Sequence, residues 1–284
     1  LTKSSEKLSS HLGSKLLGLN NFDINELEEK IKAFIPQENE TSTQYYFSSK
    51  MVEPSILGFL NIIDCEKINI HLKQNNAKVS LEIEPEDYNN KMITLESRIK
   101  DIPSTLQKKD PYWFAEIKNI KAFYFQYNSC NEREDFKISE VVEKLRESEW
   151  RNVVIDLRNN RGGDSNVLNP LVKFLKKSKD YYNKFILSGA DTYSSGIINL
   201  LELSRIPNST SVGEIPHGNP THYGEVKSFT LPNSRLKIFT SSKIFRYKGF
   251  RLGETFKPTH IVNTQIEDLL NGKDTQIEYL KRLM

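Results

Sequence analysis

The sequence predicts an α/β fold with a parallel sheet, and two neighbouring stretches carry that prediction. Residues 153–155 form a β-branched run that ends in the Gly-rich loop 156–164, after which apolar residues recur at helical spacing. Residues 185–187 are a second apolar run, and a short loop and an apolar segment from Ser194 follow it. Strands that end in loops and lead into helices are typical of parallel sheets. Ligands bind such sheets at the carboxyl ends of the strands, so both loops should face one crevice.

The residues of these two loops suggest a catalytic site. Ser194 and Ser195 stand where the second helix should begin, and unpaired backbone N–H groups and the helix dipole favour negative charge there. Gly162 and Gly163 leave the backbone uncovered, so that its N–H groups can approach a substrate oxygen. A nucleophile beside backbone donors is what acyl transfer needs. The same residues also fit a plain N-cap at Ser194 and a plain turn at the glycines.

A family resemblance strengthens the catalytic interpretation. The run Val-Val-Ile-Asp-Leu-Arg-Asn-Asn-Arg-Gly-Gly over 153–163 resembles the signature strand and loop of the S41 peptidases, the tail-specific, C-terminal-processing proteases. That family includes the tricorn protease core and the repeats of the interphotoreceptor retinoid-binding protein. Residues 191–196 resemble the nucleophile segment, with Ser194 at the place of the catalytic serine. Further similarity, over about residues 110–280, lies in the segments 112–113, 123–128, 212–218, 229–234 and 271–274.

The resemblance implies a fold, an activity and a set of site residues. The fold would be a crotonase- or ClpP-like superhelical core of βα units preceded by a helical region. The activity would be that of a serine-type hydrolase on peptide or protein substrates, with no metal and no organic cofactor. Ser194 would be the nucleophile, and the backbone of Gly162, Gly163 and Ser195 would form the oxyanion hole.

The general base is the main departure from the family pattern. In the processing proteases a lysine takes the proton of the serine, and its place after Gly213-Glu214 falls here near Asn219. An asparagine amide is not basic at neutral pH. His222 is the expected substitute, because histidine is the usual base near neutrality. His217 and Lys227 are the alternatives, although we expect His217 to be solvent-exposed and Lys227 to lie within a strand.

A second function fits the same fold. The lost lysine would also suit a catalytically inactive binding protein for a peptide or an apolar small molecule, since the retinoid-binding relatives show that this architecture need not hydrolyse anything. A titratable group within hydrogen-bond distance of Ser194 Oγ would favour the peptidase over the binding protein.

The domain organisation follows from patterns in the first half of the chain. We expect an N-terminal helical region with a β-hairpin over residues 1–104 and the protease core over 105–284, joined by a Pro- and Lys-bearing connector. Asp23 and Glu26 have the spacing of a capping box, and Pro54 suits a first helical position. Alternating apolar residues over 68–83 predict the hairpin. No PDZ domain is expected, because the length and the carboxylate-binding loop of one are missing.

Other segments give simpler expectations. Residues 1–20 are polar with scattered leucines and should be loosely packed. Residues 136–146 should form an amphipathic helix, and 223–231 should pair with 236–241 across a turn. Residues 266–283 should form one helix that covers the core as a lid.

Composition excludes several classes of protein. The 284 residues include 40 Lys and Arg against 37 Asp and Glu, a balance that argues against a dedicated nucleic-acid binder. No apolar stretch approaches the roughly 20 residues of a membrane span. Cys65 and Cys130 are too few for a disulfide scaffold and lack metal-ligand spacing, so both should be buried thiols. The family suggests an exported or lipid-anchored bacterial protein, and the sequence leaves the oligomeric state open.

Overall fold

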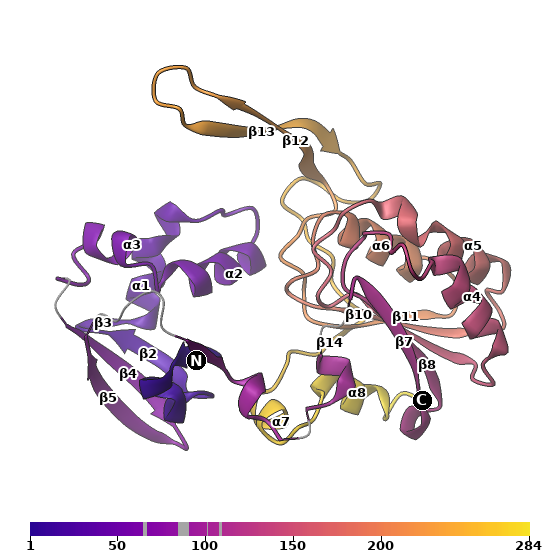
Figure 1. The fold of residues 1–284 in the computed structure, drawn as a ribbon, viewed down its shortest axis with the longest axis horizontal. Helices are drawn as coiled ribbons and strands as arrows, with labels where there is room; N and C mark the ends of the chain where they lie inside the picture. The colour runs from indigo at the N-terminus through magenta and orange to yellow at the C-terminus, as the bar shows by residue number, and fades with distance from the viewer. Residues whose placement is uncertain (65–66, 85–90, 101, 108–109) are drawn as a thin grey trace. The chain divides into compact units, whose positions relative to one another are not determined.

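The computed structural model describes residues 1–64, 67–84, 91–100, 102–107 and 110–284, and its ribbon is drawn in Figure 1. Cys65 lies outside these residues. The chain forms two compact units. Unit 1 contains Leu1–Leu106 and Gln265–Asp274, and unit 2 contains Gln107–Thr264 and Thr275–Met284. The chain therefore leaves unit 2 for ten residues near its end and then returns to it.

Unit 1 combines helices with an antiparallel sheet. Its described strands form a four-stranded sheet in the order β3-β2-β4-β5 and a separate pair, β1-β6. Apolar side chains of the helices and of the sheet share one buried cluster, which includes Leu19, Leu27, Phe47 and Leu57. The elements are β1 (Lys3–Ser5), β2 (Lys15–Leu19), β3 (Phe22–Asp23), α1 (Ile24–Ile31), α2 (Glu40–Lys50), α3 (Pro54–Phe59), β4 (Ile68–Gln74), β5 (Ala77–Ile83), β6 (Met92–Thr94) and α7 (Ile266–Leu270).

Local signals explain two helix starts in unit 1 and fail at the N-terminus. The Asp23 carboxylate accepts from the backbone N–H of Glu26, whose side chain accepts from the N–H of Asp23, so the predicted capping box is confirmed. Pro54 occupies the first turn of α3, as predicted. The expectation of a loose segment over 1–20 was wrong. β1 pairs with β6 and β2 pairs with β3 and β4, so long-range strand pairing orders a stretch that lacks a clear local pattern.

Unit 2 is built on a mostly parallel sheet, which confirms the predicted α/β class. Its described strands run in the order β14-β11-β10-β9-β8-β7, and only β7 is antiparallel to its neighbour. The strands are β7 (Tyr112–Ile117), β8 (Ala122–Tyr127), β9 (Asn152–Asp156), β10 (Asn183–Ser188), β11 (Ser209–Gly213) and β14 (His260–Ile261). The helices between them are α4 (Ile138–Glu147), α5 (Asn169–Lys177) and α6 (Ser195–Ser204).

The two faces of this sheet are covered differently. Alternate residues such as Phe123, Val153 and Ile186 point to one face and pack with apolar residues of α4, α5 and α6. The intervening residues, among them Tyr124 and Val154, pack on the other face with the last helix, α8 (Thr275–Leu280). Successive parallel strands are each added beside the one before, and the three long helices lie on a single face.

Two further elements complete the description. β12 (His222–Thr230) pairs only with β13 (Lys237–Phe245) among the described strands, forming the predicted hairpin, which projects from unit 2 in Figure 1. The expectation of a single helix over 266–283 was wrong, because α7 and α8 are separate helices and belong to different units. α7 ends at Leu270, and the segment 271–274 turns the chain before α8 begins. Across the described residues, no helix has both the length and the apolar character of a membrane span.

Candidate active site

The two loops singled out in the sequence lie against each other at the carboxyl edge of the sheet. β9 and β10 are adjacent and parallel, so their ends meet at one edge. The Tyr193 N–H donates to the Asn160 carbonyl at 2.9 Å, and the Thr192 hydroxyl donates to the Leu157 carbonyl at 2.9 Å. The Ser195 hydroxyl donates to the Gly163 carbonyl at 2.6 Å. The prediction that both loops border one place is therefore confirmed.

Ser194 has an unusual backbone conformation at the entrance to α6. Its φ of 51° and ψ of −123° lie in a region that residues with a Cβ rarely adopt. The Gly196 N–H donates to the Tyr193 carbonyl at 2.9 Å, so Ser194 is the second residue of a tight turn of the II′ kind. Although Ser194 occupies the N-cap position, its side chain makes no capping hydrogen bond. A plain N-cap therefore does not account for this serine.

Gly162 is packed directly against the Ser194 side chain. A Cβ at position 162 would lie 2.9 Å from Ser194 Cβ, 3.1 Å from Ser195 N and 3.3 Å from Ser194 Oγ. At Gly163, a Cβ would lie 2.5 Å from the carbonyl oxygen of Cys130. Both glycines also have a positive φ, of 104° and 130°. Any side chain at Gly162 would thus displace the serine.

The backbone donors near Ser194 differ in their availability. The Gly162 N–H donates to Asn160 Oδ1 at 2.9 Å in a buried position, so this member of the predicted oxyanion hole is already engaged. Among the described residues, neither the Gly163 N–H nor the Ser195 N–H has an acceptor. Two of the three predicted donors are therefore open to a ligand. Gly162 contributes in a different way, because its lack of a side chain leaves room for the side chain of Ser194.

Asn160 holds this arrangement together, and it was not among the predicted site residues. It is fully buried, and its Oδ1 accepts from Gly162 N–H and from the Cys130 thiol, at 2.9 and 3.3 Å. Its Nδ2 donates to the Tyr127 carbonyl at 2.9 Å, while its own carbonyl accepts from Tyr193. The Asn160 side chain thus fixes the end of β8 and the glycine loop, and its backbone carbonyl fixes the turn that carries Ser194. The residue type was the available signal, since a buried asparagine must find partners for both ends of its amide.

Cys130 is hydrogen-bonded to the glycine loop through its backbone. Its backbone N–H donates to the Gly162 carbonyl at 2.9 Å, and its carbonyl accepts from Asp164 N–H at 2.8 Å. The thiol is buried, as predicted, and donates to Asn160 and Asn199. Burial raises the pKa of the Cys130 thiol to about 11, so it is a neutral donor and not a nucleophile near neutrality.

A buried ion pair fixes the end of β9. Asp156 accepts from Arg158 Nη2 at 2.6 Å and from the Tyr124 hydroxyl at 2.6 Å. Arg158 Nη1 also donates to Gln276 Oε1 at 2.9 Å, which links the loop to α8. Each member of the ion pair thus has a further hydrogen-bond partner, Tyr124 for Asp156 and Gln276 for Arg158, as a buried charge requires.

The three candidate bases occupy different surroundings. The expectation that His217 is solvent-exposed was wrong. Its exposed fraction is only 4%, because its ring stacks on Tyr193 with centroids 4.8 Å apart and an interplanar angle of 2°. Its Nδ1 is hydrogen-bonded to the Ala190 carbonyl. His222 is also buried, with Nδ1 2.9 Å from the Asn219 carbonyl and its ring stacked on Phe245. Lys227 is exposed on the hairpin.

No hydrogen bond joins any of these groups to the Ser194 hydroxyl within the described part of the chain. Asn219, where the family resemblance predicts the lysine, is 1% exposed, and its carbonyl is hydrogen-bonded to His222 Nδ1. The site therefore has a nucleophile-like serine and open backbone donors, but no base bonded to the serine in this state.

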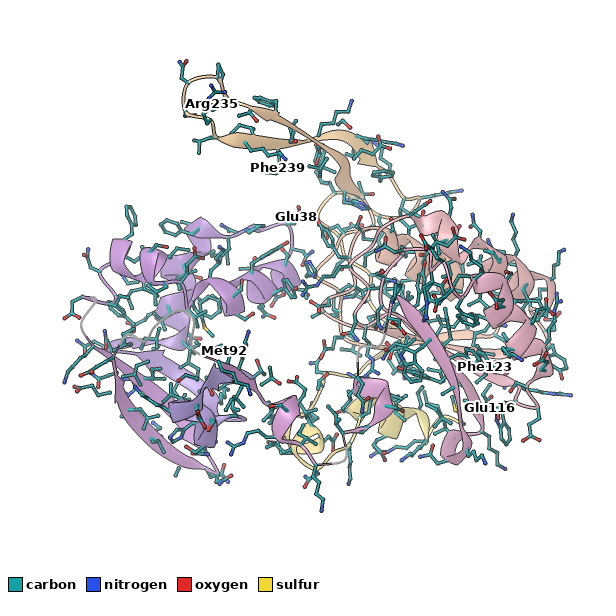
Figure 2. All side chains as sticks on the ribbon, in the orientation of Figure 1. Glu38, Met92, Glu116, Phe123, Arg235 and Phe239 are labelled. Atoms are coloured by element: carbon teal, nitrogen blue, oxygen red, sulfur yellow. The ribbon has the colours of Figure 1, made fainter. Side chains whose placement is uncertain are left out.

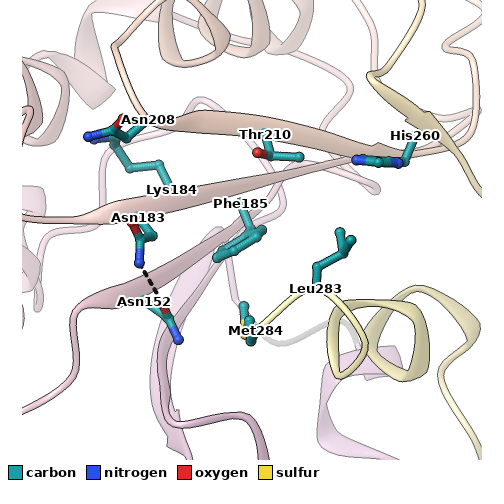
Figure 3. Close-up of a pocket in the computed structure, with 9 residues that line it drawn as sticks. All are labelled: Asn152, Asn183, Lys184, Phe185, Asn208, Thr210, His260, Leu283 and Met284. Atoms are coloured by element: carbon teal, nitrogen blue, oxygen red, sulfur yellow. Dashed lines mark hydrogen bonds between the residues drawn. The ribbon is translucent and has the colours of Figure 1, made fainter.

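A cavity of about 430 Å³ at the opposite edge of the sheet is separate from this site (Figure 3). It lies at the amino ends of β9, β10 and β11, and Asn152, Asn183, Phe185 and Thr210 line it. Lys184, which also borders it, donates from Nζ to the Lys179 and Tyr182 carbonyls, both at 2.7 Å. The Lys184 amine is therefore committed to the backbone, and His260, which also lines the cavity, has its Nδ1 3.0 Å from the Tyr279 hydroxyl.

Comparison with known proteins agrees with the predicted resemblance. Residues 121–185 match the model of peptidase family S41. This stretch runs from β8 to β10 and includes the loop with Gly162 and Gly163, but it stops before Ser194. The chain therefore resembles the S41 peptidases over this part of unit 2. No curated protein matches the chain in sequence.

Solved structures support the same fold. Mature CPAF complexed with lactacystin is 10% identical, with 96% of this chain and 77% of that chain covered and a TM-score of 0.63. Mature CPAF is 10% identical over 96% and 76%, with a TM-score of 0.59. A putative peptidase from Parabacteroides merdae ATCC 43184 is 14% identical over 93% and 89%, with a TM-score of 0.49. At such identities, the likeness to CPAF concerns the fold alone.

Proposed function

We propose that the chain is a serine-type peptidase in which Ser194 is the nucleophile. The observation that carries the proposal is the strained turn of Ser194 between β10 and α6, whose side chain is not used as a helix cap. A strained residue persists only where its surroundings hold it, and such residues cluster at active sites. The match of residues 121–185 to peptidase family S41 supports the same conclusion.

The geometry suggests how the residues would act. Ser194 Oγ attacks the carbonyl carbon of a peptide bond, and the oxyanion formed accepts from the N–H groups of Gly163 and Ser195. The base that takes the serine proton returns it to the leaving amine, which leaves an acyl-enzyme. Water then attacks the ester and passes a proton to the same base, which gives it to Ser194 Oγ as the ester bond breaks, so that the second product leaves and the free serine is restored.

His222 is our proposed base. Nδ1 faces the Asn219 carbonyl and therefore carries the proton, so Nε2 is the atom with a lone pair to accept one. Substrate binding would have to bring this nitrogen and Ser194 Oγ together, as happens when apo sites tighten in the Michaelis complex. His222→Gln should lower kcat/KM by about 10²-fold or more because general-base catalysis is lost, whereas His217→Gln should leave most of the activity if His217 only packs on Tyr193.

The test is digestion of a peptide library and of unfolded casein by wild type, Ser194→Ala and Ser195→Ala, read by mass spectrometry. Ser194→Ala should lose about 10³-fold or more in kcat/KM, because the nucleophile is removed. Ser195→Ala is the matched control, since it keeps the backbone N–H and loses only the hydroxyl that bonds Gly163. Equal cleavage by wild type and Ser194→Ala would refute the proposal.

One observation favours a second function. Asn219 stands where the family has its lysine, and no base is bonded to Ser194 among the described residues. A binding protein for a peptide or an apolar small molecule would show no cleavage by any of the three proteins, while peptides would still bind and protect the chain against unfolding.

A further inference from the structure

The hairpin β12–β13 has exposed apolar side chains on both of its faces. Phe229 lies opposite Ile238, and Phe239 lies opposite Ser228. Since successive residues of a strand alternate between faces, Phe229 and Phe239 point to opposite sides. They are 53% and 64% exposed, and Leu236 beside the turn is also exposed. Figure 2 shows Phe239 and Arg235 on this projecting element.

Both edges of the hairpin are open as well. Among the described strands, β12 and β13 pair only with each other, so each has an outer row of backbone N–H and C=O groups available. A two-stranded ribbon is marginal alone, and open edges are templates for another extended chain. A membrane would leave these backbone groups unsatisfied. An added strand would satisfy them and would also place its own alternating side chains against both faces.

Charge indicates which chains would fit. Residues 222–245 contain four basic side chains, Lys227, Arg235, Lys237 and Lys243, and one acidic side chain, Glu225. Glu225 is paired with Lys243 at 3.2 Å, so the distal half is entirely basic. Two copies of this hairpin would repel each other, whereas an acidic segment would be attracted.

The base of the hairpin is attached beside the candidate nucleophile. A Cβ at Gly218 would lie 2.9 Å from Tyr193 Cδ2 and 3.1 Å from Ile197 Cγ1, so the chain leading into β12 packs on the residue before Ser194. The Thr221 hydroxyl donates to the Phe250 carbonyl at 3.0 Å and accepts from Tyr247 N–H, which fastens both ends of the hairpin. A chain bound along the hairpin would thus be led toward Ser194.

We propose that the β12–β13 hairpin captures extended segments of unfolded polypeptide substrates that carry acidic and apolar side chains, by strand addition at an open edge. This inference rests on the proposed peptidase function and names the class of substrate. Strands of nine residues extend about 30 Å. We expect a six-residue peptide, about 20 Å long when extended, to bind at Ser194 without contacting residues 229–239, which form the half of the hairpin farther from its attachment at Thr221.

The direct test measures binding without cleavage. Fluorescence anisotropy of labelled unfolded casein is recorded with the full chain carrying Ser194→Ala, and again with Phe229→Ser and Phe239→Ser added. Loss of two exposed aromatic cross-strand contacts should weaken binding about tenfold. Arg235→Glu with Lys237→Glu should weaken binding more at low salt than at high salt. Phe59→Ser is the matched control, because Phe59 is 74% exposed in unit 1 and should not affect binding.

Activity provides a second, separable test. With Ser194 intact, the hairpin variants should raise KM for unfolded casein and leave kcat/KM for a six-residue peptide unchanged. Equal casein binding by the hairpin variants, or binding of anionic vesicles and not of casein, would overturn the inference. If wild type cleaves nothing while casein binding still depends on the hairpin, the peptidase proposal fails and the capture surface stands.

Discussion

The turn at Ser194 and the β12–β13 hairpin are close along the chain but are built in opposite ways. Around Ser194, Asn160 has every polar atom of its side chain bonded, and Gly162 fits with no room for a methyl group. On the hairpin, Phe229 and Phe239 face solvent and the strand edges are unpaired in the described structure. Both features carry a free-energy cost, the first in backbone strain and the second in exposed apolar surface.

The contrast shows how one unit can combine two tasks. Chemistry needs atoms held to within a fraction of an ångström, so the serine is fixed by buried hydrogen bonds from three chain segments. Recognition of many unfolded chains needs main-chain pairing that does not depend on sequence, so open edges suit it better than a shaped pocket. The following predictions test this division, from the largest expected effect to the smallest.

After replacement of Ser194 itself, Gly162→Ala should be the change that most reduces activity. Its Cβ would meet Ser194 Cβ at 2.9 Å, and the positive φ of 104° adds strain. A displacement of the serine by about 1 Å should cost about 100-fold in kcat/KM. Gly58→Ala is the control, since no atom lies within 4 Å of its Cβ position and alanine suits α3. Equal activity of both variants would contradict the packing described for Ser194.

Asn160→Ala should markedly lower stability. It leaves the Gly162 N–H and the Tyr127 carbonyl without their partner in a buried place, which should cost about 2–4 kcal/mol in the free energy of unfolding. Asn183→Ala removes an exposed amide bonded to Asn152 at 3.1 Å and should change stability by less than about 0.5 kcal/mol. Urea unfolding of the two variants measures the difference. Similar values would mean that Asn160 is not the hub of the site.

Alkaline pH should weaken the fold through Cys130. Its pKa is raised from 9.0 to about 11, so the folded state keeps a proton that the unfolded state loses between these values. Stability from this group is therefore fully present below pH 9 and is lost as pH rises toward 11, by up to about 2–3 kcal/mol. Cys130→Ala should show a shallower fall of unfolding free energy over that window. Identical slopes would show that the thiol does not titrate as described.

The smallest effect should come from the hairpin. Phe239→Ser should change the free energy of unfolding by less than about 0.5 kcal/mol, because this side chain is 64% exposed. Phe123→Ser should cost about 3 kcal/mol or more, since Phe123 is buried between the sheet and its helices. Figure 2 labels both residues. Strong destabilisation by Phe239→Ser would mean that the hairpin is part of the core and not a surface for substrates.

Local signals in the sequence predicted elements of both units well. The β-branched run of β9, the capping box at Asp23 and the alternation over 68–83 are each decided by neighbours in the chain. The same reasoning placed Ser194 and the glycines at one edge, because adjacent parallel strands end together.

Features that depend on distant partners could not be predicted in this way. His217 is buried because it stacks on Tyr193, and the sequence around its Pro-Gly turn suggests exposure. Asn160 is a hub only through contacts with β8 and with the Ser194 turn. The hydrogen bond from Gly162 N–H to Asn160 Oδ1 also depends on the folded geometry, and it cannot be predicted from the identities of these two residues alone.

The return of the chain to unit 2 at residue 275 affects the order in which the protein can mature. Ile277 and Leu280 cover the face of Tyr124 and Val154, and Gln276 bonds Arg158 at the root of the glycine loop. During synthesis, β9 and the Ser194 turn emerge long before this covering helix does. One face of the strands that carry the site therefore stays partly uncovered until the helix from Thr275 has been synthesised. If the chain is a peptidase as proposed, its site would stay unfinished until that moment, and a nascent chain could not yet cleave its neighbours.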